Sequence, residues 1–145
     1  MKTLAAALFM VPALAFAQPA TGGGVPFPRE TAAPPAAVAP ARAALTDELY
    51  GASPPLTAAR LDLEHEALLV RASSGAVCGN AVGCPTAVMV RNGASWKAVW
   101  TGMTFGRGTV LSTSHGGLRD IALAAPRGSR LLRFDGTSYV EAKDR

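Results

Sequence analysis

The chain has 145 residues, of which 49% are hydrophobic and 17% are charged, and its formal net charge is +4. This length suits one domain of ordinary size. Eleven prolines and fifteen glycines exclude a long helical bundle. After the N-terminal segment, no run reaches the ~18 consecutive apolar residues that a membrane span needs.

The first 17 residues have the pattern of a secretory signal peptide. Lys2 supplies a positive charge, residues 4–15 are apolar, and Ala15-Phe16-Ala17 resembles a cleavage site. No cysteine follows that site, so we expect no lipid anchor. The sequence therefore predicts a bacterial protein that is periplasmic or secreted, with no transmembrane segment in the mature chain.

Residues 18–44 differ in composition from the rest of the chain. Proline, glycine and alanine supply 18 of these 27 residues, and no apolar stripe with a regular period is visible. Such a segment buries too little surface to offset the entropy of ordering it. The composition predicts a disordered or polyproline-like tether, which leaves residues 45–145 as a β-rich globular domain.

The predicted elements of this domain begin with a short helix over residues 56–66, because Pro54-Pro55 precedes a series of leucines with acids between them. Asn92-Gly93 and Asp135-Gly136 each lie between apolar runs and predict β-hairpins. We expect the fold to be α+β, mainly antiparallel β, a small disulfide-closed sheet domain with one short N-terminal helix. Its seven expected strands cover residues 67–71, 86–91, 95–101, 108–113, 120–124, 130–134 and 137–140.

Cys78 and Cys84 are the only cysteines, and each has a glycine just inside the loop between them. In an oxidising compartment this pair predicts a disulfide that closes a small ring. Redox or metal roles are the alternatives. A redox site would more typically have the spacing C-x-x-C, and a zinc site would need further ligands such as His65 and His115.

Four motifs follow one another from residue 75 onwards: the cysteine loop of 75–84, Trp96, the segment 113–121 with Thr, Gly and Asp-Ile, and the Phe-Asp-Gly…Tyr segment of 134–139. This order, over about residues 60–140, resembles small exported bacterial proteins of uncharacterised function. Many of those proteins are distantly similar to single calcium-loop β repeats. Residues 61–66, the corresponding stretch here, lack the glycine and alternating Asp/Asn ligands of a calcium loop. We therefore expect no metal and no cofactor.

Charge is unevenly distributed along the expected domain. Residues 45–66 carry a balance of −4, and residues 67–145 carry +6. The basic part would suit an anionic envelope component or another exported protein as partner. The alternative is that the acidic segment docks on the basic one. Basic and aromatic residues do not alternate, so we expect no nucleic-acid partner.

Ser112, Ser114, His115 and Asp120 lie within nine residues and invite a comparison with a Ser-His-Asp site. No G-x-S-x-G elbow is present, and triad members normally come from distant parts of a chain. The simpler interpretation is that the glycine pair after His115 turns the chain, with His115 on the surface and Asp120 accepting backbone hydrogen bonds.

The sequence thus favours an exported, non-catalytic binding or accessory module of the bacterial envelope, and not an enzyme. The alternatives are a small exported hydrolase that uses His115 and Asp120, and an inhibitor of an exported enzyme that presents the cysteine loop. Trp96 and Trp100 lie four apart on one expected strand, so alternation predicts that they share a face, as core or as a binding platform. The candidate binding surface comprises Trp96, Trp100, His115, Arg119 and Asp120.

Overall fold

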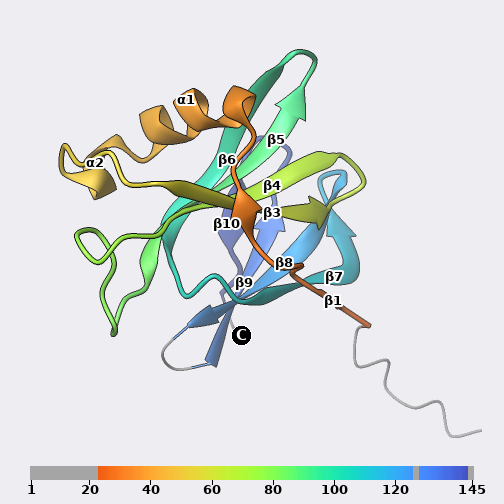
Figure 1. Cartoon of the computed structure of the whole chain (residues 1–145). Helices are drawn as coiled ribbons and strands as arrows, with labels where there is room; N and C mark the ends of the chain where they lie inside the picture. The colour runs from red at the N-terminus through yellow and green to blue at the C-terminus, as the bar shows by residue number, and fades with distance from the viewer. Residues whose placement is uncertain (1–22, 126–127, 144–145) are drawn as a thin grey trace, which may run out of the picture.

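The computed structural model describes residues 23–125 and 128–143, which form ten strands and two helices (Figure 1). The expected signal peptide and residues 18–22 lie outside this part. In chain order the elements are β1 (Val25–Pro26), β2 (Thr31–Ala32), α1 (Pro35–Ala44), α2 (Thr46–Leu49), β3 (Leu56–Asp62), β4 (Glu66–Ala72), β5 (Cys84–Asn92), β6 (Ser95–Thr104), β7 (Gly108–His115), β8 (Leu118–Ala125), β9 (Gly128–Phe134) and β10 (Tyr139–Glu141).

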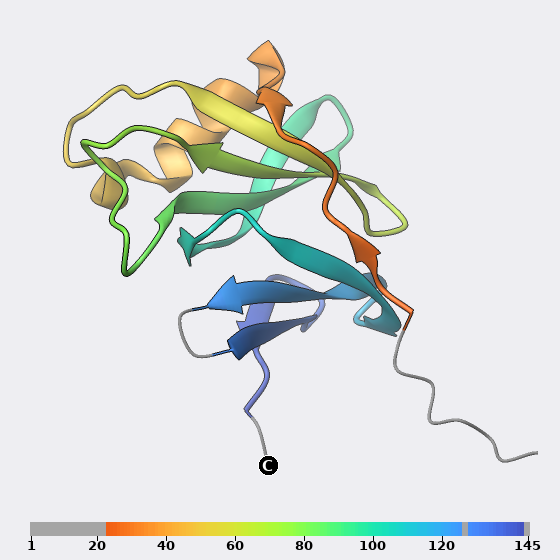
Figure 2. The same cartoon turned by 60° about the horizontal axis from the view of Figure 1, so that its bottom comes forward.

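The strands form two five-stranded antiparallel sheets. The N-terminal sheet has the order β2-β3-β4-β5-β6, and the C-terminal sheet has the order β1-β7-β8-β9-β10. Figure 2 shows three layers, with the helices above the N-terminal sheet and the C-terminal sheet below it. The expected fold class is confirmed, because the structure is mainly antiparallel β with a short helix near the N-terminus. None of the helices described is long and apolar enough to cross a membrane.

Residues 23–33 join the two sheets along one side, where the sequence predicts a tether. β1 pairs with β7, with Val25 opposite Val110, and β2 pairs with β3, with Thr31 opposite Ala58. One segment therefore forms an edge of both sheets, and it crosses from one to the other in Figure 2. The tether prediction is wrong for the described residues 23–44. A strand edge offers backbone partners that the composition of this segment does not reveal.

Glu30 holds this segment in place between β1 and β2. Its carboxylate accepts two hydrogen bonds from the Arg71 guanidinium, both 2.8 Å long, and a third of 2.8 Å from the Thr57 hydroxyl. Burial raises the pKa of Glu30, but the hydrogen bonds from Arg71 and Thr57 and the charge of Arg71 outweigh this effect and lower it. The contact is therefore a charge-assisted clamp in a mostly buried position.

The helix lies at residues 35–44 and not at 56–66, so its predicted position is wrong. Pro35 occupies the first turn of α1, where a missing backbone N–H is tolerated. Ala37 and Ala41, spaced by one turn, are fully buried against the N-terminal sheet. Residues 56–62 instead form β3, because their leucines and alanines pair with β4 along the whole strand. Short apolar runs of this kind fit both periods.

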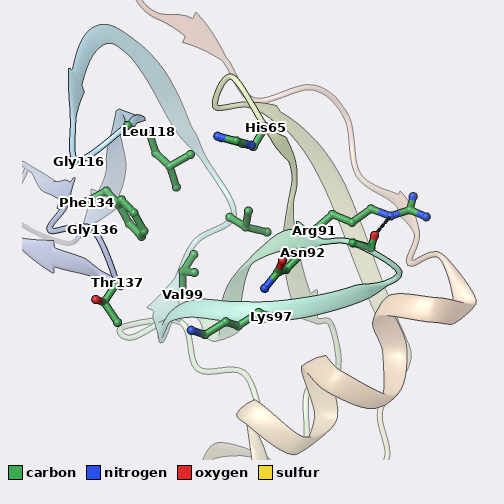
Figure 3. Close-up of a pocket in the computed structure, with 13 residues that line it drawn as sticks. His65, Arg91, Asn92, Lys97, Val99, Gly116, Leu118, Phe134, Gly136 and Thr137 are labelled. Atoms are coloured by element: carbon green, nitrogen blue, oxygen red, sulfur yellow. Dashed lines mark hydrogen bonds between the residues drawn. The ribbon is translucent and has the colours of Figure 1, made fainter.

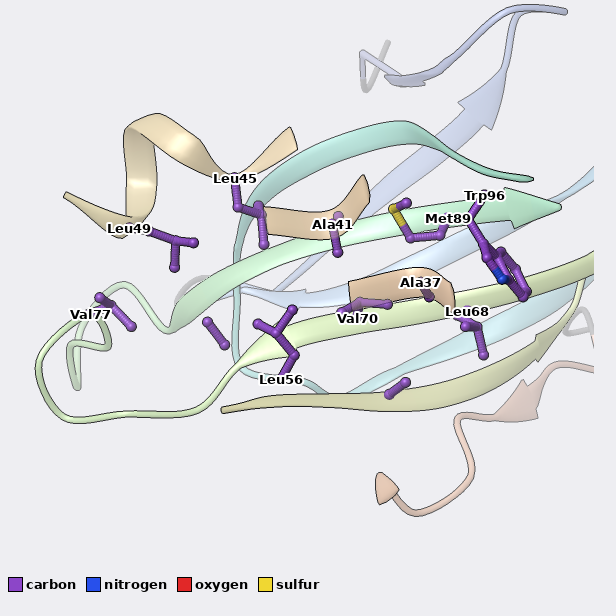
Figure 4. Close-up of a cluster of buried hydrophobic side chains, with 13 residues drawn as sticks. Ala37, Ala41, Leu45, Leu49, Leu56, Leu68, Val70, Val77, Met89 and Trp96 are labelled. Carbon is purple, nitrogen blue, oxygen red and sulfur yellow. The ribbon is translucent and has the colours of Figure 1, made fainter. Parts of the chain in front are cut away.

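Two hydrophobic cores lie on opposite faces of the N-terminal sheet. The helix-side core, drawn in Figure 4, packs the helices against that sheet and includes Ala37, Ala41, Leu45, Leu49, Leu56, Leu68, Val70, Met89 and Trp96. The inter-sheet core lies between the sheets and includes Leu61, Leu63, Leu69, Val88, Val99, Val110, Leu118, Ile121, Leu123, Leu132 and Tyr139.

Both predicted hairpins form, with turns that differ in detail. Asn92 pairs with Ser95, so Gly93 and Ala94 make the first turn and only Gly93 has a positive φ, 62°. The second hairpin has a four-residue loop, 135–138, whose Asp135 carboxylate accepts the amides of residues 137 and 138 at 2.8 and 2.9 Å. These hydrogen bonds lower the pKa of Asp135.

The disulfide between Cys78 and Cys84 forms as predicted, with 4.3 Å between the two Cα atoms. Gly79 and Gly83 exchange two backbone hydrogen bonds of 2.8 Å inside the ring. Gly83 has a φ of 87°, and a side chain there would overlap the backbone carbonyl of Thr104. The ring lies where β5 begins, at the opposite end of that strand from the hairpin turn at Gly93.

Candidate functional site

The two tryptophans of the candidate surface lie on opposite faces of the N-terminal sheet, contrary to the prediction. The β5–β6 ladder contains a bulge in which Val99 is the extra residue, so Trp100 pairs with Val88 and Ala98 with Met89. A single extra residue reverses the alternation of all residues beyond it. Trp96 is buried in the helix-side core, and Trp100 packs against the inter-sheet core.

His115 and Asp120 are brought into contact on neighbouring strands β7 and β8. The Asp120 carboxylate is 1% exposed and lies 2.8 Å from His115 Nδ1, while the Thr113 hydroxyl donates to it at 2.7 Å. Arg133 Nε, from β9, lies 3.9 Å from the same carboxylate. The His115 side chain is half exposed, as expected. Asp120, however, uses side-chain partners, whereas the sequence predicts backbone hydrogen bonds in a turn.

Tyr139 completes this polar cluster from β10. Its hydroxyl donates a 2.7 Å hydrogen bond to the backbone carbonyl of Arg119. Burial raises the pKa of Tyr139, and the nearby negative charge of Asp120 raises it further, so the phenol stays protonated. Chemically, the cluster can fix the orientation of the His115 ring. Within residues 23–125 and 128–143, the hydrogen bonds of that ring all go to Asp120.

Ion pairs connect the acidic segment 45–66 to the basic part of the chain. Glu66 lies 3.1 Å from Arg91, and Glu64 lies 3.5 Å from Arg119. Two of the acidic side chains therefore dock on basic ones, which was one of the two alternatives for the uneven charge. Arg119, one of the five residues of the candidate surface, is occupied in this way.

A pocket of about 590 Å³ opens between the two sheets at one end of the molecule, and we call it the sheet-end pocket. Three turns and one strand pairing meet there: the β3–β4 turn, the β5–β6 hairpin, the β7–β8 turn and the β9–β10 loop (Figure 3). Its lining residues are His65, Val90, Arg91, Asn92, Gly93, Lys97, Val99, Gly116, Gly117, Leu118, Phe134, Gly136 and Thr137.

Glycine is required where two of these turns touch. Gly116 and Gly117 have φ values of 60° and 93°, which suit a tight two-residue turn between β7 and β8. A Cβ on Gly116 would lie 2.7 Å from the Phe134 carbonyl oxygen and 2.8 Å from the Gly136 nitrogen. The close approach of the β7–β8 turn to the β9–β10 loop therefore shapes one wall of the pocket.

The charge of the pocket is positive. Among the described lining residues are His65, Arg91 and Lys97, and there is no carboxylate. Arg91 is held by other partners, since it pairs with Glu66, donates a 3.1 Å hydrogen bond to the Gly93 carbonyl and lies over the Trp96 ring. In Figure 3 its guanidinium points away from Leu118 and Phe134.

The sequence singled out none of the pocket side chains. A signal was nevertheless present, because the turns at residues 93, 116–117 and 135–136 alternate with turns at the other end of the strands. In an antiparallel meander, alternate turns lie at the same end. Strand order and the packing of one sheet on the other were also needed, and neither follows from local pattern.

In the described ranges, no group of three or more His, Cys, Asp or Glu side chains is placed to hold a metal ion. No family model matches the chain, and neither a curated protein nor a solved structure matches it closely enough to indicate a relationship. The resemblance to small exported bacterial proteins therefore stays a prediction.

Proposed function

We propose that the chain is a non-catalytic exported binding module whose ligand occupies the sheet-end pocket. One observation carries this proposal: a pocket of about 590 Å³ with an apolar floor and polar groups at its edge. Val90, Val99, Leu118 and Phe134 supply the floor. Small-molecule sites commonly have volumes of ~300–1,000 Å³ and combine apolar walls with a few polar groups.

The chemistry of the lining supports binding over catalysis. Among its described residues there is no Asp, Glu, Ser or Cys that would serve as a nucleophile or paired acid. Export is supported by the signal-like sequence of residues 1–17, and the disulfide between Cys78 and Cys84 suits an oxidising compartment.

A neutral apolar fluorophore, N-phenyl-1-naphthylamine, tests the proposal directly. We expect saturable binding to one site, with enhanced fluorescence, because an apolar floor takes up the aromatic rings. Val90→Trp places a large side chain in the pocket and should abolish this binding. Val82→Trp is the matched control, because Val82 is 55% exposed on the cysteine loop and takes no part in the pocket.

Circular dichroism and thermal unfolding of both variants show whether they keep the fold. The proposal is wrong if the folded wild-type protein shows no saturable binding. It is also wrong if folded Val90→Trp binds the probe as tightly as Val82→Trp does.

A small hydrolase is the second candidate, and the contact between His115 and Asp120 favours it. A buried carboxylate on Nδ1 is the arrangement that orients a histidine for general-base catalysis. Hydrolysis of p-nitrophenyl acetate by wild type and His115→Ala distinguishes the two functions. Turnover that disappears in folded His115→Ala would favour the hydrolase, and equal rates for the two proteins would favour the binding module.

A further inference from the structure

We infer that the ligand of the sheet-end pocket is an organic anion, with an acidic group that pairs with Lys97 and an aromatic or aliphatic body that lies on the apolar floor. This inference rests on the proposed function and names the class of ligand. It follows from the position of Lys97, from the occupation of its cationic neighbours and from the shape of the site.

Lys97 lies on the inner face of its strand. It pairs with Val90 in the β5–β6 ladder, so the two side chains project from the same face of the N-terminal sheet. Val90 packs against the inter-sheet core, which identifies this face as the one toward the other sheet. The pocket begins where that core ends, and Lys97 lies at its edge. A charged side chain that projects from a core face needs solvent or a partner.

The other arginines near this end of the molecule are already paired. Arg91 pairs with Glu66, and Arg119 pairs with Glu64. Within the described part of the chain, no carboxylate lies within ion-pair distance of Lys97. Lys97 is therefore the cation of the pocket whose charge remains available to a ligand, and no acidic side chain of the lining would repel an anion.

The remaining lining defines the body of the ligand. Phe134 and Leu118 form an apolar wall on the side of the C-terminal sheet, and Val99 faces them from the N-terminal sheet (Figure 3). The bulge that makes Val99 the extra residue places its side chain in the inter-sheet core. An aromatic or acyl group of modest size would bury apolar surface between these walls.

Lys97 also has an alternative role that needs no ligand. It lies on β6, an edge strand of the N-terminal sheet, and an inward-pointing lysine on an edge strand discourages pairing with a second chain. That role predicts that removing the charge promotes self-association and leaves the affinity for anions unchanged. The two roles therefore differ in what the same variant does.

A pair of related fluorophores separates the ligand class from the existence of the site. N-phenyl-1-naphthylamine is neutral, and 1-anilinonaphthalene-8-sulfonate is a similar molecule that carries a sulfonate. We expect wild type to bind the sulfonate more tightly than the neutral probe, and this preference to shrink in high salt. Lys97→Met should weaken binding of the sulfonate about five- to tenfold and leave the neutral probe within about twofold.

Lys143→Met is the matched control. It removes the same charge from an exposed position outside the pocket, and Lys97 and Lys143 are the only lysines after Lys2. It should leave both affinities unchanged. Sedimentation of each variant measures its oligomeric state at the concentrations used for binding.

The outcomes distinguish two failures. If neither probe binds, or if Val90→Trp blocks neither, the sheet-end pocket is not a ligand site and the proposed function fails with the inference. If both probes bind with equal affinity and Lys97→Met changes neither, the pocket is a site but not for anions. Lys97→Met that self-associates with unchanged affinity for the sulfonate also overturns the inference, because Lys97 then protects the edge strand.

Discussion

The two faces of the N-terminal sheet are covered in different ways. On one face, α1 packs its small side chains Ala37 and Ala41 closely against the strands. On the other, a second sheet supplies larger side chains such as Ile121 and Leu132, and its glycine turns stop short of the sheet end. A helix can follow one face closely with alanine alone, whereas two twisted sheets diverge toward their ends. The pocket therefore opens on the face that a sheet covers.

Leu69 and Val70 compare the two faces directly, because they are neighbours on β4, both fully buried, and belong to different cores. Leu69→Ala should lower the free energy of unfolding by about 2–5 kcal/mol, since it opens a cavity between two sheets. Val70→Ala removes fewer methyl groups under the helix and should cost about 1.5–2.5 kcal/mol. Urea unfolding of the two variants measures both values.

The comparison also predicts how each variant affects the pocket. Leu69→Ala acts on the core that ends at the pocket and should weaken binding of N-phenyl-1-naphthylamine, whereas Val70→Ala should not. Equal losses of stability and binding in the two variants would show that the two faces are not separate packing units.

The segment that joins the sheets is broken most specifically at Glu30. Glu30→Gln removes the charge from three hydrogen bonds to Arg71 and Thr57 and should cost about 1–3 kcal/mol at pH 7. The equivalent change at Glu141, whose side chain and partner Arg130 are both exposed, should cost about 0–1 kcal/mol. Chemical denaturation of both variants tests this difference.

The effect of Glu30 should also depend on pH. Its pKa is lowered in the folded protein, so its contribution is fully present above the unfolded value near 4.5 and is lost as the pH falls through the folded value. The difference in stability between wild type and Glu30→Gln should therefore shrink below pH 4.5. A difference that stays constant from pH 7 to pH 3 would contradict the role of the charge.

Turn chemistry made much of the fold predictable from the sequence. The hairpins at Gly93 and Asp135, the β7–β8 turn and the disulfide all follow from residues close together in the chain. The order of residues 23–44 could not be inferred in the same way, because the partners of β1 and β2 are strand edges that lie 26 to 85 residues away, as Thr31 opposite Ala58 and Val25 opposite Val110 show. Composition registers local propensity and not such pairing.

The candidate site was less predictable than the fold. Contact between His115 and Asp120 depends on an irregular β7–β8 register between Val110 and Ser114, and the placement of Trp100 depends on the bulge at Val99. A bulge adds one residue without a clear sequence signature, yet it reverses which face the later side chains occupy. The inward position of Lys97 is a further consequence of strand register, since only its pairing with buried neighbours identifies the inner face.

Tyr50 offers a small effect confined to the helix layer. It ends α2 in a left-handed conformation with a φ of 50°, and its side chain is 87% exposed. Tyr50→Gly should raise the free energy of unfolding by up to about 1 kcal/mol, because glycine adopts this conformation without the steric cost of a Cβ. Tyr50→Ala removes the same ring but keeps the Cβ, so it should bring little gain. Thermal unfolding of the two variants isolates the backbone contribution, and probe binding should be unchanged in both, since the sheet-end pocket lies on the other face. A gain of the same size in Tyr50→Ala would instead assign the effect to the exposed ring.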